Sequence, residues 1–195
     1  EYQLEDLAFT IKDNQLELKS GPNKPLLSVT KTSSDILFSC GAYGTLLTSK
    51  DKGETWLLVS AELDNPDNFH LNSVIAAPDG NLYIVGENGL GFHSNNLGKT
   101  WSSMTLPYSG SLFGIISNNV KTNDETTDSS TQLVAFGLQG NVIISLDGGA
   151  HWQHKKLPTS ASLLGGYFSS QGHAYLVGHG GIIVNFKPEN IEKLH

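Results

Sequence analysis

The sequence contains no arginine, because all 12 of its basic residues are lysine. No site within it can therefore grip a carboxylate through a bidentate guanidinium fork. Charged residues make up only 16% of the chain, below the roughly 25% of an ordinary domain. The net charge is −7 and the pI is about 5.4. A nucleic-acid or anionic-membrane partner thus has no electrostatic basis.

Cysteine, long apolar runs and metal-binding patterns are also scarce. The lone Cys40 lies in the apolar run 36–40, which favours a buried thiol and excludes an internal disulfide. No apolar stretch approaches the length of a transmembrane helix, so we expect no membrane insertion. Among the seven histidines, His151 and His154 are three residues apart on a predicted strand and would face opposite sides. We expect no metal and no cofactor.

Glycine, by contrast, is abundant at 21 residues, and one short phrase recurs three times. The phrase, here called the box, reads Ser-x-Asp/Asn-x-Gly-x-Thr/His-Trp and occurs at residues 49–56, 94–101 and 145–152. Asp or Asn can brace a tight turn, Gly supplies a positive φ, and Trp restarts a strand as a buried apolar anchor. We expect a structural role for Ser49, Asp51, Gly53, Trp56, Ser94, Asn96, Gly98, Trp101, Ser145, Asp147, Gly149 and Trp152.

A second motif consists of two glycines separated by two residues, at 41–44, 86–89, 137–140 and 178–181. In the first three copies the second glycine lies five residues before the serine of the box. Each pair follows an apolar run, and two intervening residues fit a tight two-residue hairpin. The fourth copy has no box after it.

These motifs divide the chain into four units, at about residues 26–60, 72–106, 112–157 and 163–186. The first three read as four short antiparallel strands each, with outer strands over 54–60, 99–106 and 150–157, and the fourth reads as three strands. Such a repeat predicts an all-β fold, a β-propeller of about four four-stranded blades, in preference to a solenoid. The tract 118–131, which is poor in apolar residues, predicts a surface loop.

Three full units and a three-stranded fourth would leave sheet edges and an apolar blade face uncovered. Strand patterns within residues 1–20 are candidates to close the ring, and we expect one of them to pair beside 182–186. The chain would then be a single propeller domain over residues 1–195. A homo-oligomer that completes the ring and a fragment of a larger ring are the alternatives, and both stay open.

The boxes resemble the Asp-box, or BNR, repeat of sialidases, of some plant-polysaccharide hydrolases and of non-enzymatic propellers. The combination of an apolar strand, the glycine pair, a second apolar strand and the box resembles the photosystem II assembly and stability factor-like propellers, over about residues 26–186. This resemblance implies an exported, non-catalytic protein that helps to assemble a membrane complex. The family usually has about seven blades. Its photosynthetic members carry an arginine-rich patch, and the absence of arginine here favours a client other than a photosystem.

The sialidase chemistry implied by the broader resemblance needs three arginines around the substrate carboxylate, and this chain has none. Other retaining glycosidases need two carboxylates about 5–5.5 Å apart, and Glu87 is the only acid at a predicted inner turn. We therefore expect no catalytic residue and no enzyme. The alternative is a carbohydrate-active Asp-box propeller, sialidase-like or of glycoside hydrolase type, that binds or cleaves glycans.

The residues between the paired glycines are the best candidates for binding. In a propeller these turns share one edge, here called the rim, with the connections between blades, and partners usually bind there. The candidates for a protein-binding rim are Tyr43, Glu87, Asn88, Gln139 and His179. The sequence thus predicts an interaction propeller that supports assembly or stability of an envelope or membrane complex. We expect it outside the cytoplasm, in a periplasm or lumen or secreted.

Overall fold

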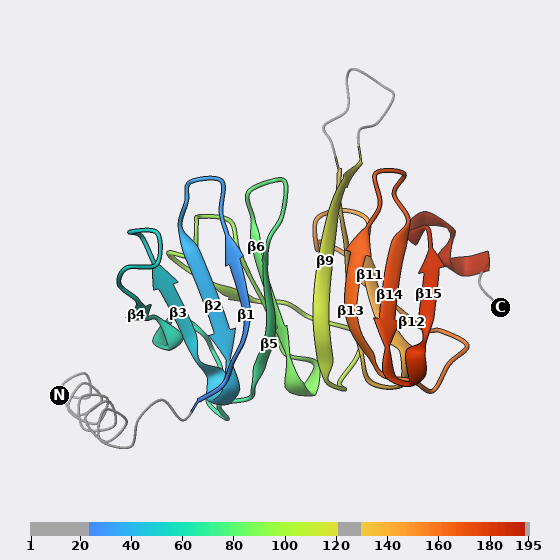
Figure 1. Cartoon of the computed structure of the whole chain (residues 1–195), viewed down its shortest axis with the longest axis horizontal. Helices are drawn as coiled ribbons and strands as arrows, with labels where there is room; N and C mark the ends of the chain where they lie inside the picture. The colour runs from blue at the N-terminus through green and yellow to red at the C-terminus, as the bar shows by residue number, and fades with distance from the viewer. Residues whose placement is uncertain (1–23, 121–129, 194–195) are drawn as a thin grey trace.

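The computed structural model describes residues 24–120 and 130–193. In these ranges the chain forms four antiparallel sheets, or blades, that stand side by side (Figure 1). Three blades have four strands and the last has three, and the strands of each blade follow one another in sequence order. The helical segments in the described ranges are short 3-10 turns. The predicted all-β propeller fold with about four blades is therefore confirmed.

The first blade contains β1 (Leu26–Lys31), β2 (Leu37–Gly41), β3 (Leu46–Ser49) and β4 (Leu57–Leu58). The second contains β5 (Leu71–Ala76), β6 (Leu82–Gly86), β7 (Gly91–Ser94) and β8 (Ser102–Ser103). The third contains β9 (Leu112–Val120), β10 (Ser130–Gly137), β11 (Asn141–Ser145) and β12 (Gln153–Lys156), and the fourth β13 (Leu163–Phe168), β14 (Ala174–Gly178) and β15 (Ile183–Phe186). The 3-10 turns are η1 (Ala42–Gly44), η2 (Ser60–Glu62), η3 (Glu87–Gly89), η4 (Leu138–Gly140), η5 (His179–Gly181) and η6 (Pro188–Lys193).

The apolar core lies between the blades rather than within any one of them. Along a strand, alternate side chains point to opposite faces, so each blade presents one apolar face to its predecessor and one to its successor. Phe38 and Cys40 of the first blade pack against Leu82 and Ile84 of the second. The first strands lie next to one another, β1 beside β5, β5 beside β9 and β9 beside β13.

The outer strands are much shorter than the predicted ranges 54–60, 99–106 and 150–157. β4 and β8 have two residues each and β12 has four. The box immediately precedes each outer strand and uses backbone N–H groups for its own turn. These strands also lie at the solvent-exposed edge of the blade, where nothing beyond them extends the ladder. The pattern of residue types located the strands but overestimated their length.

The tract 118–131 is not all loop. β9 runs to Val120 and pairs with β10, with Val120 opposite Ser130 and Asn118 opposite Gln132. Ladder hydrogen bonds join backbone groups and need no apolar side chains. The polar composition of the tract therefore gave no sign that the two strands extend into it. The expected closing strand within 1–20 lies outside the described residues.

Candidate functional site

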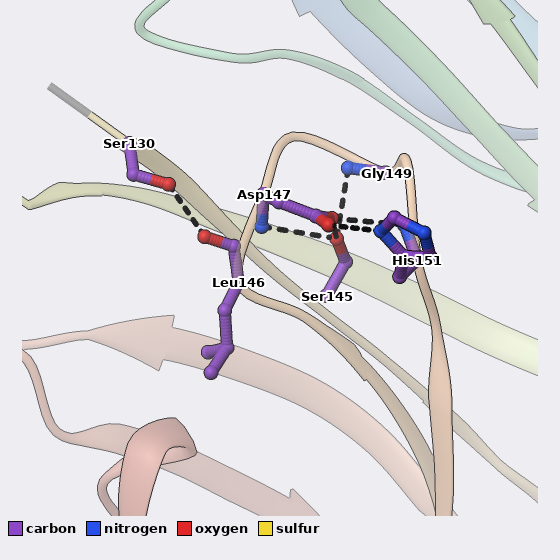
Figure 2. A network of polar contacts seen from close by, with 6 residues as sticks. All are labelled: Ser130, Ser145, Leu146, Asp147, Gly149 and His151. Carbon is purple, nitrogen blue, oxygen red and sulfur yellow. Dashed lines mark hydrogen bonds and ion pairs between the residues drawn. The ribbon is translucent and has the colours of Figure 1, made fainter. Parts of the chain in front are cut away.

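Each box folds into a turn held by its own side chains, and Figure 2 shows the third one. The Ser145 hydroxyl donates to Asp147 Oδ1 at 2.8 Å and accepts the Gly149 N–H at 2.8 Å. His151 donates its N–H to Asp147 Oδ1 at 2.9 Å, and its Nδ1 lies 2.6 Å from Asp147 Oδ2. The carboxylate is thus occupied by groups of the same turn.

The other two boxes make equivalent bonds. Thr55 donates its N–H and its hydroxyl to the Asp51 carboxylate, at 2.9 and 2.5 Å. These bonds, with one from Ser49, lower the pKa of Asp51 to about 2. In the second box Asn96 accepts the Thr100 N–H at 3.0 Å and donates its amide to Thr100 Oγ1 at 2.7 Å. A neutral amide makes equivalent bonds, so a box turn can form without a charged side chain.

Two of the three box tryptophans pack against the preceding blade, and the third does not. Trp101 of the second blade meets the ring of Phe38 of the first edge to face, with centroids 6.1 Å apart. Trp152 joins the cluster between the second and third blades. Trp56, in the first box, is 38% exposed. The expectation that all three are buried anchors is wrong for Trp56, because no described blade stands in front of the first.

The rim turns are two-residue hairpins, but their central pair lies one residue later than predicted. Tyr43, Asn88 and Gln139 have φ near 55°, and the glycine after each also has a positive φ. Positive φ at both central positions is typical of a type I′ turn. The first glycine of each pair has another role. On Gly41, for example, a Cβ would lie 2.2 Å from the Pro25 carbonyl oxygen, so that position needs a close backbone approach.

The structure brings two of the predicted rim residues together through His70, which the sequence pattern did not single out. Tyr43 of the first blade contacts the His70 ring edge to face, with centroids 5.1 Å apart. Glu87 of the second blade accepts the His70 N–H at 2.9 Å, and its other oxygen lies 3.3 Å from His70 Nδ1. Tyr43 is 58% exposed. Its ring and the Glu87 carboxylate therefore belong to one surface.

A second pair meets through Ser162, in the connection between the third and fourth blades. The Gln139 N–H donates to Ser162 Oγ at 3.4 Å, and the His179 N–H donates to the Ser162 carbonyl at 2.9 Å. His70 and Ser162 both lie just before the first strand of a blade, outside the repeated motifs. The repeat therefore gave no signal that could have found either residue.

Asn88 lies at an open depression of about 620 Å³ between the second and third blades. The turn 88–89, the connection 104–109 and His154 line it. The His154 ring stacks on Tyr108, with centroids 5.1 Å apart, and His154 Nε2 lies 2.9 Å from Asn141 Oδ1.

The described part of the chain gives no indication of a metal site or a membrane-spanning helix. Within residues 24–120 and 130–193, no three His, Cys, Asp or Glu side chains form a group that could hold a metal ion. In the same ranges, no helix has the length and apolarity to cross a membrane.

Solved structures with similar folds include YCF48 from Cyanidioschyzon merolae, at 16% identity and a TM-score of 0.59, over 85% of this chain and 53% of that one. A YCF48 structure bound to D1 peptide shares 22% identity at a TM-score of 0.43, over 85% and 66% of the chains. The GH74 enzyme of Niastella koreensis shares 14% identity at a TM-score of 0.64, over 85% of this chain and 29% of that one. The first and third of these likenesses show the fold, and the chain spans about half the length of the Cyanidioschyzon merolae protein.

A search of curated proteins by sequence found no match. Residues 10–111 match the family described as photosynthesis system II assembly factor YCF48. The match spans just over half of the sequence and includes the first two boxes and the first two glycine pairs. The chain therefore belongs to the family of the photosynthesis system II assembly factor YCF48.

Proposed function

We propose that this chain is a non-catalytic interaction propeller, which binds a protein partner at its rim and supports assembly or stability of an envelope or membrane complex. The main observation in favour is the contrast between the two edges of the blades. The polar groups of the box turns bond within their own turns, whereas the rim presents Tyr43, 58% exposed, and an open depression beside Asn88. Membership of an assembly-factor family supports the same function.

The rim suits a segment of protein better than a sugar. A glycan site usually needs several aromatic platforms, and the tyrosines placed for that on the described rim are Tyr43 and Tyr108, each already in contact with one histidine ring. The depression is instead bordered by the turn 88–89 and the connection 104–109. An extended segment of protein could use backbone hydrogen bonds and aromatic contacts there together.

Catalysis has no support at this surface. Glu87, the acid on the rim turns, is bonded to the His70 N–H and contacts its ring. The box acids Asp51 and Asp147 are occupied by Thr55 and His151. We further propose an extracytoplasmic location, in line with the family resemblance. We also propose a client other than a photosystem, because the chain has no arginine to form the arginine-rich patch of the photosynthetic relatives.

The proposal is tested by capture from the detergent-solubilised membranes of the source cells. The immobilised parent is compared with the double variant Tyr43→Asn/His154→Ala and with Glu54→Ala on the box edge. Asn suits the left-handed backbone at position 43, as Asn88 does in the next blade. We expect one protein that parent and Glu54→Ala retain and that the double variant loses by at least tenfold. Equal capture by all three, or binding only on a glycan array, would refute the proposed function.

A further inference from the structure

Two histidines of the described rim each pack against a tyrosine, but one of them lacks the carboxylate that the other has. His70 meets Tyr43 and His154 meets Tyr108, with ring centroids 5.1 Å apart in both pairs. Beside the first histidine, Glu87 supplies a carboxylate, whose Oε1 lies 3.3 Å from His70 Nδ1. In the described residues, the hydrogen-bond partner of the His154 ring is instead the amide of an asparagine.

The lack of an acid beside His154 follows from the sequence of the rim turns. Glu87 is the first residue of η3, and the corresponding residue of η4 in the third blade is Leu138. A leucine side chain cannot pair with an imidazole. None of the described residues that line the depression beside His154 is Asp or Glu. The place that Glu87 fills next to His70 is therefore open next to His154 in the described part of the chain.

Asn141 determines which nitrogen of the neutral His154 ring carries the hydrogen. Asn141 Nδ2 donates to the Leu138 carbonyl at 2.7 Å, which leaves Oδ1 of the same amide as an acceptor. His154 Nε2 lies 2.9 Å from that oxygen and must therefore carry a hydrogen. The other ring nitrogen, Nδ1, has no hydrogen-bond partner among the described residues. It is an acceptor while the ring is neutral and becomes a donor when the ring is protonated.

The charged groups around His154 favour an anionic ligand. Lys156 lies two residues further along β12, on the same face of the strand. Tyr108 is the other titratable group of the described residues that faces the ring, and burial raises the pKa of its phenol, which is therefore neutral. The Glu87 carboxylate is bonded to the His70 N–H at 2.9 Å. Protonation of His154 therefore gives two positive charges on one wall of the depression.

We propose that the depression binds the side-chain carboxylate of an Asp or Glu of the protein partner, and that protonated His154 donates to it from Nδ1. This inference rests on the proposed function and names the chemistry of the partner. The carboxylate makes with His154 the contact that Glu87 makes with His70, and Lys156 adds a second positive charge.

Binding at this site is stronger in mild acid. An imidazole gains its proton between about pH 8 and pH 5, whereas a carboxyl group with an ordinary pKa of about 4 is still ionised there. When the ring is neutral, the lone pair on Nδ1 faces the carboxylate and the contact is lost.

Nuclear magnetic resonance of the chain with 15N-labelled histidine tests the site with two capped peptides, acetyl-Ala-Glu-Ala-amide and its Gln counterpart. The Glu peptide should shift the His154 resonances and bind at least fivefold more tightly at pH 5.5 than at pH 8, and the Gln peptide should have no effect. His154→Gln should abolish the binding. His151→Thr is the matched control, because Thr has that place in the other two boxes, and it should bind the Glu peptide as the parent does.

Absence of binding at about 20 mM Glu peptide would overturn the proposal. Equal binding of the Glu and Gln peptides, binding that does not strengthen as the pH falls, or binding that survives in His154→Gln would overturn it too. A Gln peptide with a free carboxyl terminus that binds more tightly than the capped Glu peptide would show a site for chain ends, which also contradicts a side-chain carboxylate. Far-UV circular dichroism at both pH values checks that the blades remain folded.

Capture from solubilised membranes at pH 5.5 and pH 8 separates this inference from the proposed function. A protein that the parent and His154→Gln retain equally at both pH values would show a partner that does not use this site, and only the present inference would fail. Capture of no protein, together with the expected binding of the Glu peptide, would refute the proposed function and leave the carboxylate site in place.

Discussion

The box glycines share one backbone conformation but have different neighbours. Gly53 and Gly98 have φ of 95° and 75°. A Cβ on Gly98 would lie 2.4 Å from Phe38 of the preceding blade, whereas on Gly53 it would come no closer than 3.5 Å to Leu37. Two separate reasons therefore require glycine at position 98: its positive φ, and its close contact with Phe38 of the preceding blade.

Gly98→Ala should accordingly destabilise the chain more than Gly53→Ala does. Both changes carry the cost of a left-handed alanine, about 1 kcal/mol, and only Gly98→Ala adds overpacking against Phe38, about 1–3 kcal/mol more. Urea denaturation followed by tryptophan fluorescence measures the difference. Equal midpoints for the two variants would contradict the contact between the box and the preceding blade.

The Asp51 carboxylate should make stability depend on pH. Bonds from Thr55 and Ser49 lower its folded pKa to about 2 from an ordinary value of 3.8. Its contribution is therefore complete above about pH 4 and is lost as the pH falls through the folded pKa, about 2. Asp51→Asn keeps the turn, as Asn96 does, and should flatten the fall in thermal midpoint between pH 4 and 2. Glu54→Gln is the matched control, and the same flattening there would argue against a special role of Asp51.

Cys40 should be unreactive in the folded chain. It is fully buried between the first two blades, and burial raises the pKa of its thiol to about 12. We expect a disulfide-exchange reagent at pH 8 to label it at the rate of unfolding, and at once in 6 M guanidinium. Rapid labelling without denaturant would show that the junction opens locally.

At the scale of the strand and turn, the sequence predicted the second strand of each blade well because each of these strands is an apolar run that ends at a glycine. β6 and β14, for example, both end at such a glycine. The outer strands were overestimated, since β4 is only two residues long and pairs on one side. The position of each rim turn was correct, but its register was one residue off because the glycine pair alone does not show which glycine has the positive φ.

The box tryptophans test the packing of one blade on the next. Trp101→Ala should lower the free energy of unfolding by roughly 3 kcal/mol, because the indole packs on Phe38 and leaves a cavity when truncated. Trp56→Ala should cost about 1 kcal/mol or less, since that side chain is already part-exposed. Guanidinium unfolding of both variants, each compared with the parent, gives the comparison. A larger loss for Trp56→Ala would mean that residues outside those described pack on it.

At the scale of the whole molecule, the repeat predicted which turns share an edge but not which of them meet. The meetings depend on His70 and Ser162, which lie in connections between blades whose sequences do not repeat. The depression beside Asn88 is likewise lined by Tyr108, in a connection between blades, and by His154 of the third blade, whose rings stack. Neither contact has a spacing along the chain that a pattern could reveal.

The central claim is that a protein partner binds the rim while the boxes only hold the fold. Its most direct test is a photo-reactive phenylalanine analogue placed at position 43 on the rim or at position 54 on the box edge, expressed in the source cells. Both positions are exposed. Irradiation should join position 43 to one membrane-complex protein and leave position 54 without an adduct. Adducts of equal yield from both positions, or from position 54 alone, would contradict the account.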